Sequence, residues 1–113
     1  MFLEELLEGL SDVLPSTETR YVNAPKDTAF AVWDAAVTSV PADCAPARRE
    51  YEAVVTLVEP PTADGSARRA LEAALDEAAV DWSHDRRGWS EAERVYATDY
   101  TITWAEKATS KAR

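Results

Sequence analysis

At 113 residues, the chain is long enough to form one domain with a buried core that needs neither disulfides nor metal. Its formal net charge is −9, from 21 acidic and 12 basic residues, which argues against binding duplex DNA by neutralising phosphates. No apolar run approaches the roughly 20 residues of a membrane span, and acidic residues stand where a signal peptide would be positive.

Residues 2–14 are predicted to form an amphipathic helix that ends near Pro15. Apolar residues recur on one side at helical spacing, and acidic residues occupy the other side. The apolar set is Phe2, Leu3, Leu6, Leu7 and Leu10, and the acidic set is Glu4, Glu5, Glu8 and Asp12. We interpret this helix as packed on a sheet, and binding to a partner is the alternative.

The middle of the chain is predicted to contain three strands and one long loop. Residues 19–23 and 28–36 have strand patterns, although the alanines of the second segment leave a helix open. Residues 38–49 contain two prolines and no period, which predicts a loop of a length that often carries function. Residues 51–58 alternate strongly and stop before Pro60, so they are predicted to form a strand.

A second helix is predicted over about residues 66–82, and it should lie across the sheet. Its apolar stripe is Ala67, Leu71, Ala74, Leu75, Ala78 and Trp82. Residues 83–94 are polar, with Gly88 as a turn residue, and a short strand around Trp89 fits within them.

Residues 95–104 give the strongest local signal in the chain. Aromatic and β-branched residues alternate there with a period of two, which predicts a strand with two different faces. The face expected to seal the core holds Tyr96, Tyr100, Ile102 and Trp104, and the face expected to meet a neighbour holds Asp99, Thr101 and Thr103.

These elements predict one α+β domain over residues 1–106. Its sheet should be mainly antiparallel with about four strands, and both helices should pack on one face. Residues 107–113 have no apolar period, so they are expected to form a flexible tail or to dock on a partner.

The sequence offers no catalytic constellation, and we predict that the protein is not an enzyme. His84 is the only histidine and Cys44 the only cysteine, so neither belongs to a metal signature. A Cys–His nucleophile pair would need these two residues to be adjacent in space. No glycine-rich phosphate loop exists, and no cofactor or metal is expected.

The candidate interaction residues are aromatic, basic or on the outer face of the last strand. Three arginine doublets, at 48–49, 68–69 and 86–87, suggest salt bridges between subunits, and solvated arginines are the alternative. One of Trp33 and Trp89 is expected to be exposed in an isolated subunit, as tryptophans at interfaces often are. The candidate interface residues are Trp33, Arg48, Arg49, Trp89, Asp99, Thr101, Thr103, Lys107 and Lys111.

Two stretches, LVEPPTADGSARRALEAALDEAAVDW and ERVYATDYTITWAEK, carry a resemblance to a known family. They contain a Tyr-led strand ended by proline, an alanine-rich helix ending near Trp, and a Y-x-x-x-Y-x-I-x-W strand. The pattern covers residues from about 20 to 106 and resembles the tail terminator (tail completion) proteins of long-tailed bacteriophages, particularly those that infect high-GC actinobacteria.

The resemblance implies a structural role in the virion. Such proteins form a homohexameric ring that caps the tail tube, stops its polymerisation and joins it to the head–tail connector or stopper protein. The resemblance therefore implies self-association, a tail-tube partner, a location in the tail or neck after assembly in the host cytoplasm, and DNA that passes through the lumen without specific binding. It implies no catalysis, no cofactor and no membrane.

Other functions stay open at this point. A head–tail stopper or connector would share the partners, and a small intracellular protein-interaction domain would bind one protein. A cryptic enzyme would use Cys44 or His84. By analogy with the family, the interfaces are expected in residues 38–49, on the exposed sheet face and in the C-terminal tail.

Overall fold

The computed structural model describes residues 2–20, 25, 27–39 and 48–107. Within them the chain forms two helices and six strands. The elements in order are α1 (Phe2–Gly9), β1 (Ser16–Glu18), β2 (Phe30–Ser39), β3 (Arg48–Glu59), α2 (Ser66–Ala78), β4 (Asp81–His84), β5 (Gly88–Ser90) and β6 (Val95–Lys107).

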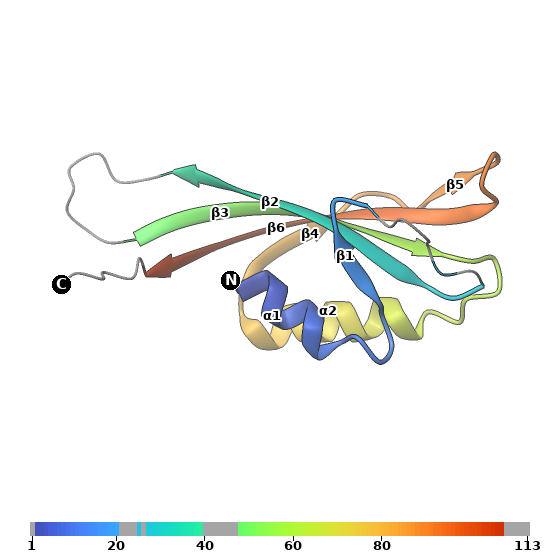
Figure 1. The fold of residues 1–113 in the computed structure, drawn as a ribbon, viewed down its shortest axis with the longest axis horizontal. Coiled ribbons are helices and arrows are strands. Elements are labelled where there is room, and N and C mark those ends of the chain that lie inside the picture. Colours follow the sequence, from blue (N-terminus) through green and yellow to red (C-terminus); the bar gives the residue numbers. More distant parts are fainter. Residues whose placement is uncertain (1, 21–24, 26, 40–47, 108–113) are drawn as a thin grey trace.

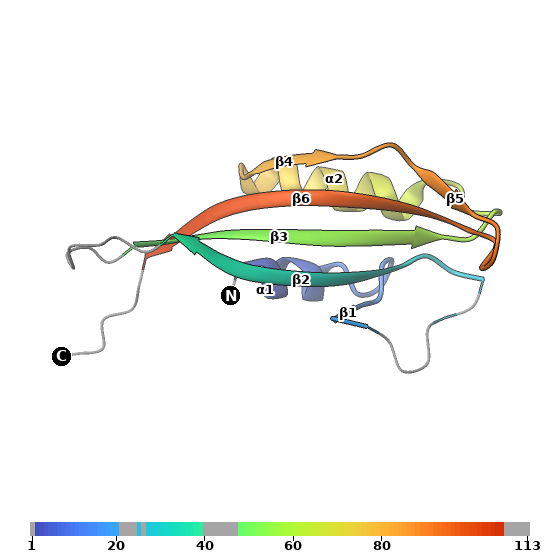
Figure 2. The same cartoon turned by 90° about the horizontal axis from the view of Figure 1, so that it is seen from above.

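The strands form one twisted sheet in the order β1-β2-β3-β6-β4, and β5 pairs with β6 beside β4 (Figures 1 and 2). Only the β1–β2 pair is parallel. The predicted α+β class with a mainly antiparallel sheet is therefore confirmed. The expectation of about four strands was too low, because the additional strands are three or four residues long. Segments this short carry almost no alternation and form by pairing with long neighbours.

The boundaries near the N-terminus differ from those predicted. α1 ends at Gly9 rather than near residue 14, and the chain continues through turns, although Leu14 stays fully buried. The first strand lies at Ser16–Glu18 instead of 19–23. Thr19 adopts a left-handed backbone with φ of 75° and ends the strand. Residues 21–23 of the predicted strand lie outside the described residues.

The second helix ends at Ala78, four residues before the predicted end. Ala79 takes the left-handed conformation that closes many helices, and its N–H donates to the carbonyl of Asp76. The chain then enters β4, where Trp82 pairs with Ile102 of β6. Because of this strand pairing, Trp82 belongs to the sheet and not to the helical stripe. Its indole Nε1 donates to Asp76 Oδ1 of α2 at 2.9 Å.

The three central strands are longer than the sequence pattern indicated. β2 continues to Ser39, β3 begins at Arg48 and β6 runs to Lys107, so strand replaces both ends of the predicted loop. Residues 40–47 of that loop are outside the described part. Figure 1 shows this end of the sheet reaching well beyond the helices, which accounts for the overall extents of 51 × 28 × 24 Å.

The core lies between one face of the sheet and the two helices (Figure 1). Tyr100 and Ile102 are fully buried and Trp104 is 8% exposed, whereas Asp99 and Thr103 on the opposite face are exposed. The two-faced character predicted for this strand is thus confirmed. The buried apolar residues are Leu3, Leu7, Leu14, Ala31, Trp33, Ala53, Val55, Leu57, Ala67, Leu71, Leu75, Tyr100, Ile102 and Trp104.

Candidate interaction surface

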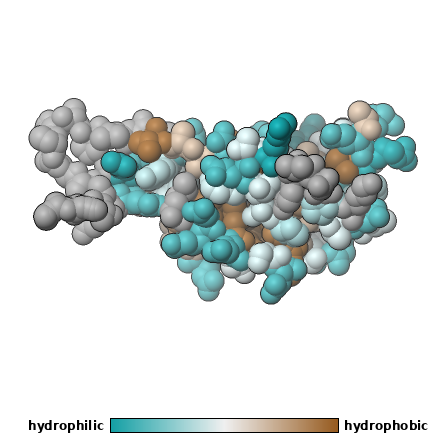
Figure 3. Space-filling model, viewed as in Figure 1, coloured by the Kyte–Doolittle hydropathy of each residue, from teal (hydrophilic) through white to brown (hydrophobic). Residues whose placement is uncertain are grey.

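The part of the sheet that extends beyond the helices is called the arm here. It consists of residues 36–39 of β2, 48–52 of β3 and 103–107 of β6. The register sets Val37, Tyr51 and Trp104 in one row across the three strands. Val37 is 44% exposed, and Figure 3 shows apolar surface on this end of the molecule. A projecting, partly apolar sheet is a feature of surfaces that bind other proteins.

Aromatic rings fix the base of the arm on its helix side. Trp104 stacks on Tyr51 with ring centroids 5.2 Å apart and an interplanar angle of 6°. On its other side it meets Phe2 of α1 at 5.3 Å in a tilted arrangement. Because contacts between aromatic rings add to the effect of burial, these three residues tie α1 to the arm and make its base rigid.

Glu106 completes this joint with two hydrogen bonds. Its Oε2 accepts from the backbone N–H of Phe2 and from indole Nε1 of Trp104, each at 2.8 Å. Partial burial by itself raises the pKa of Glu106, but the two donated hydrogen bonds outweigh burial and hold the pKa below its usual value. The ionised carboxylate is therefore the form that joins α1 to β6.

We expect the Glu106 joint to weaken in acid. Because the folded-state pKa is depressed, its stabilisation is complete above the ordinary value of 4.5 and is lost as the pH falls through the lower folded-state value. The stabilities of the wild type and of Glu106→Gln, measured by urea unfolding, should therefore differ at pH 7, and the difference should shrink as the pH is lowered below 4.5. A difference that stays the same across this pH range would show that the charge of Glu106 contributes nothing.

The sheet face opposite the helices is called the open face here. Between Asp34 and Asp99 its charged residues are acidic, and Val54 at 41% exposure lies among them, whereas the register places Arg48 and Lys107 at its far end. On this face Thr56 Oγ1 donates a hydrogen bond to Asp99 Oδ1 at 2.7 Å. The acidic residues that the register places on it are Asp34, Glu50, Glu52, Asp81 and Asp99. This face suits a basic or neutral partner and repels nucleic acid.

A shallow hollow of about 470 Å³ lies where the arm meets β4. It opens between the end of β3 and the outer edge of β6. The lining residues are Glu50, Tyr51, Glu52, Asp81, Thr103, Trp104 and Ala105. Three of these seven are acidic, so the hollow continues the charge of the open face around the edge of the sheet.

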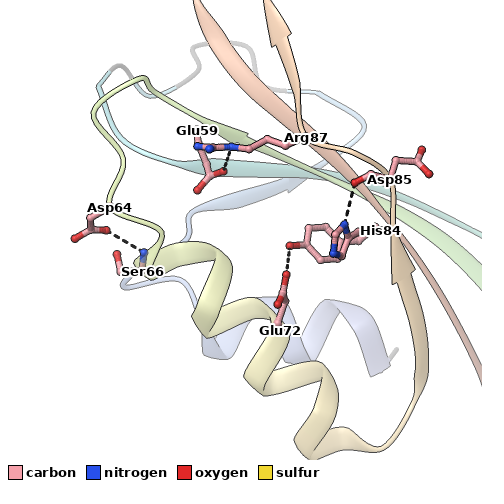
Figure 4. A network of polar contacts seen from close by, with 8 residues as sticks. Glu59, Asp64, Ser66, Glu72, His84, Asp85 and Arg87 are labelled. Atoms are coloured by element: carbon pink, nitrogen blue, oxygen red, sulfur yellow. Dashed lines mark hydrogen bonds and ion pairs between the residues drawn. The ribbon is translucent and has the colours of Figure 1, made fainter.

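A polar cluster lies beneath the first turns of α2, at the end of the sheet away from the arm (Figure 4). The carboxylate of Glu59 is 1% exposed and faces Arg87 Nε at 3.3 Å. Neither of its oxygens is in hydrogen-bond geometry with any described residue, so the ion pair with Arg87 is the contact that offsets this charge. The guanidinium of Arg87 also lies 3.9 Å above the ring of Tyr96.

Tyr100 joins α2 to the sheet within the same region. Its hydroxyl donates to Glu72 Oε2 at 2.6 Å, and the ring is fully buried. Burial, followed by the hydrogen bond and the negative charge of Glu72, raises the pKa of Tyr100 far above its usual value. The phenol therefore stays neutral and acts as a fixed hydrogen-bond donor.

The candidate interface residues do not form one cluster. Trp33 is 6% exposed within the core, whereas Trp89 is 42% exposed, which confirms that one of the two lies at the surface. Arg49, Asp99 and Thr103 are exposed, and Thr101 is half-buried. The backbones of Arg48 and Lys107 pair at the end of the arm, but their side chains and all of Lys111 lie outside the described part.

The two residues considered for catalysis are not seen together. His84 is exposed on β4, where Nδ1 lies 2.9 Å from the carbonyl oxygen of Asp85 (Figure 4). Cys44 is outside the described residues. In the described part of the chain, no three histidine, cysteine, aspartate or glutamate side chains gather in a way that would hold a metal ion.

Sequence reasoning missed Glu59, Arg87 and Glu106. Glu59 continues the odd-numbered positions of β3, which are the buried ones, so the strand alternation contained a signal for its burial. Arg87 and Glu106 had no such signal, because Glu59 is 28 residues from Arg87 and Phe2 is 104 residues from Glu106 in the chain.

No protein-family model matches this chain, and no curated protein matches it. None of the described helices is long and apolar enough to cross a membrane.

Proposed function

We propose that this protein is a structural virion subunit, a tail terminator that forms a homohexameric ring on the tail tube and joins it to the head–tail connector. The observation that carries the proposal is the arm, an extension of three strands past the helices with an acidic open face and exposed Val37. Outside its aromatic base this projection is exposed, at Ala36, Val37, Arg49, Glu50 and Ala105, which favours a role in assembly.

Three further features support this proposal. The order of helix, strands, long strand, helix and long strand agrees with the pattern of elements on which the sequence resemblance rests. The acidic open face suits a ring through which DNA passes without being gripped. The aromatic joint of Phe2, Tyr51 and Trp104 gives the arm a fixed direction, as a repeated contact in a symmetric ring requires.

The test is the oligomeric state of the purified protein and its effect on tube growth. We expect light scattering to give the mass of six subunits and negative-stain images to show rings. Added to polymerising tail-tube protein, the rings should stop elongation and remain at one end of each tube. A protein that stays monomeric at high concentration, or one that leaves tube length unchanged, would contradict the proposal.

A head–tail stopper is separated from a terminator by the same experiment. A stopper would form rings but would bind the portal-side ring in a pull-down and leave tube length unchanged. Capture of the tube protein by the wild-type ring, without capture of the portal, is the result expected for a terminator.

A further inference from the structure

The two edges of the arm each leave a short run of strand without a neighbour among the described residues. On one edge, β1 pairs with β2 only as far as Trp33, and regular pairing of β2 with β3 continues to Val37. On the other edge, β4 pairs with β6 only as far as Thr103, and β6 continues to Lys107. Residues 34–37, which begin just before the arm, and residues 104–107 therefore form two runs of equal length that pair with no other described strand.

The hydrogen-bond pattern shows which backbone groups these edges present. Ala31 N donates to the Pro15 carbonyl, and the Trp33 carbonyl accepts from Thr19, so odd residues of β2 point their backbone groups away from β3. The same parity directs the N–H and C=O of Val37 outward. On β6 the Asp99 carbonyl accepts from Asp85, so the backbone groups of Ala105 point outward from the other edge.

Most side chains along these edges do not protect them. Exposed edges in natural sheets are commonly blocked by lysine, proline or inward charges. The β2 edge instead has small uncharged residues at positions 35–37, and Ala105 follows Trp104 on the β6 edge. The charged residues of the two runs are Asp34 at the start of the β2 run, Glu106, which is engaged with Phe2 and Trp104, and Lys107 at the end of the β6 run.

The two edges are suited to each other in direction. β2 and β6 are both antiparallel to β3, so they run the same way and both end at the tip of the arm. A second copy rotated about an axis along the arm thus presents its β6 edge to the β2 edge of the first, for parallel pairing. This contact uses two different surfaces of each subunit, and such head-to-tail contacts generate rings.

The positions of the edges also agree with a closed ring. Asp34 is level with Thr101, so the free run of β6 begins three residues further along the arm than that of β2. This stagger is about 10 Å along the strands, and three strands are about 14 Å wide. If neighbouring sheets join with that stagger, their strands tilt by roughly 35° to the ring axis. This angle is within the range of strand tilts found in closed barrels.

We propose that neighbouring copies join by pairing residues 34–37 of β2 with residues 104–107 of β6, so that the arms form one continuous sheet. The occupant of each edge is a second copy of this chain. This inference rests on the proposed function and specifies the contact between subunits. A single contact of this length binds weakly. Closure of the ring strengthens the overall binding, because each subunit then makes two such contacts.

The test removes one outward N–H from each edge. Val37→Pro deletes the donor of the β2 edge and Ala105→Pro that of the β6 edge, while the hydrogen bonds to β3 remain. Each variant should retain the thermal unfolding of an isolated subunit to within a few degrees. Each should weaken the contact between subunits by about tenfold or more and yield no rings. Val37→Ala, which keeps the N–H, is the matched control and should form rings.

A mixture of the two proline variants gives the sharpest result. Each variant keeps the edge that the other lacks, so at high protein concentration the mixture should form a one-to-one pair through the single intact contact, and this pair should not grow into rings. If Ala105→Pro forms rings unaided, or if both variants assemble like the wild type, the proposed pairing is wrong, although the tail-terminator function stands. A wild-type protein that forms no ring at any concentration would instead overturn the proposed function itself.

Discussion

Replacing Trp104 with alanine is expected to lower the free energy of unfolding by about 3–5 kcal/mol. The indole is 8% exposed, stacks on Tyr51 and contacts Phe2. Its removal therefore leaves a cavity at the place where the arm meets α1. It also removes the Nε1 donor to Glu106. Urea unfolding followed by far-UV circular dichroism should show a lower midpoint with an unchanged slope.

The control for this prediction is Trp104→Phe. Phenylalanine keeps a ring between Tyr51 and Phe2 but cannot donate to Glu106, so the loss should be smaller, about 1–2 kcal/mol. If the alanine variant loses no more stability than the phenylalanine variant, the stacked rings do not hold the base of the arm.

Replacing Arg87 with methionine is expected to cost about 2–3 kcal/mol, because it leaves the buried carboxylate of Glu59 without a compensating charge. This figure is below the usual 3–5 kcal/mol for breaking a buried pair, since the Arg87 side chain is 39% exposed and water reaches this side of the contact. The lost cation–π contact with Tyr96 adds a smaller amount. Denaturant titration of the purified variant measures the change.

The second member of the pair provides the control. Glu59→Met removes the buried charge and replaces it with an apolar chain, so this variant should be close to neutral in stability. The double variant with Arg87→Met should then be more stable than Arg87→Met alone, despite having more substitutions. If the double variant is less stable than either single variant, Glu59 does not behave as a buried charge that needs Arg87.

The long strands and the helices were predictable because each displays its periodicity within its own residues. The alternation of residues 95–104 identified Tyr100, Ile102 and Trp104 as core residues, and the helical spacing identified Leu3, Leu7, Leu71 and Leu75. These patterns depend only on which side chains share a face. They require no knowledge of what that face meets.

The candidate interaction surface was predictable only in part. The sequence predicts that one of Trp33 and Trp89 is exposed. Which of the two is buried depends on where β2 meets the helices. The arm was not predicted, because the prolines and alanines of residues 38–49 interrupt the alternation that would indicate a strand at each end of that segment.

The sequence by itself determined the α+β class, the two-faced last strand and the excess of acidic residues, since composition and local periodicity are enough to define them. The tertiary structure alone decided the six-strand order, the early end of α2, the Glu59–Arg87 pair and the two free edges of the arm. Each of these depends on contacts between segments far apart in the chain, and strand pairing supplies hydrogen bonds that local sequence preference does not encode.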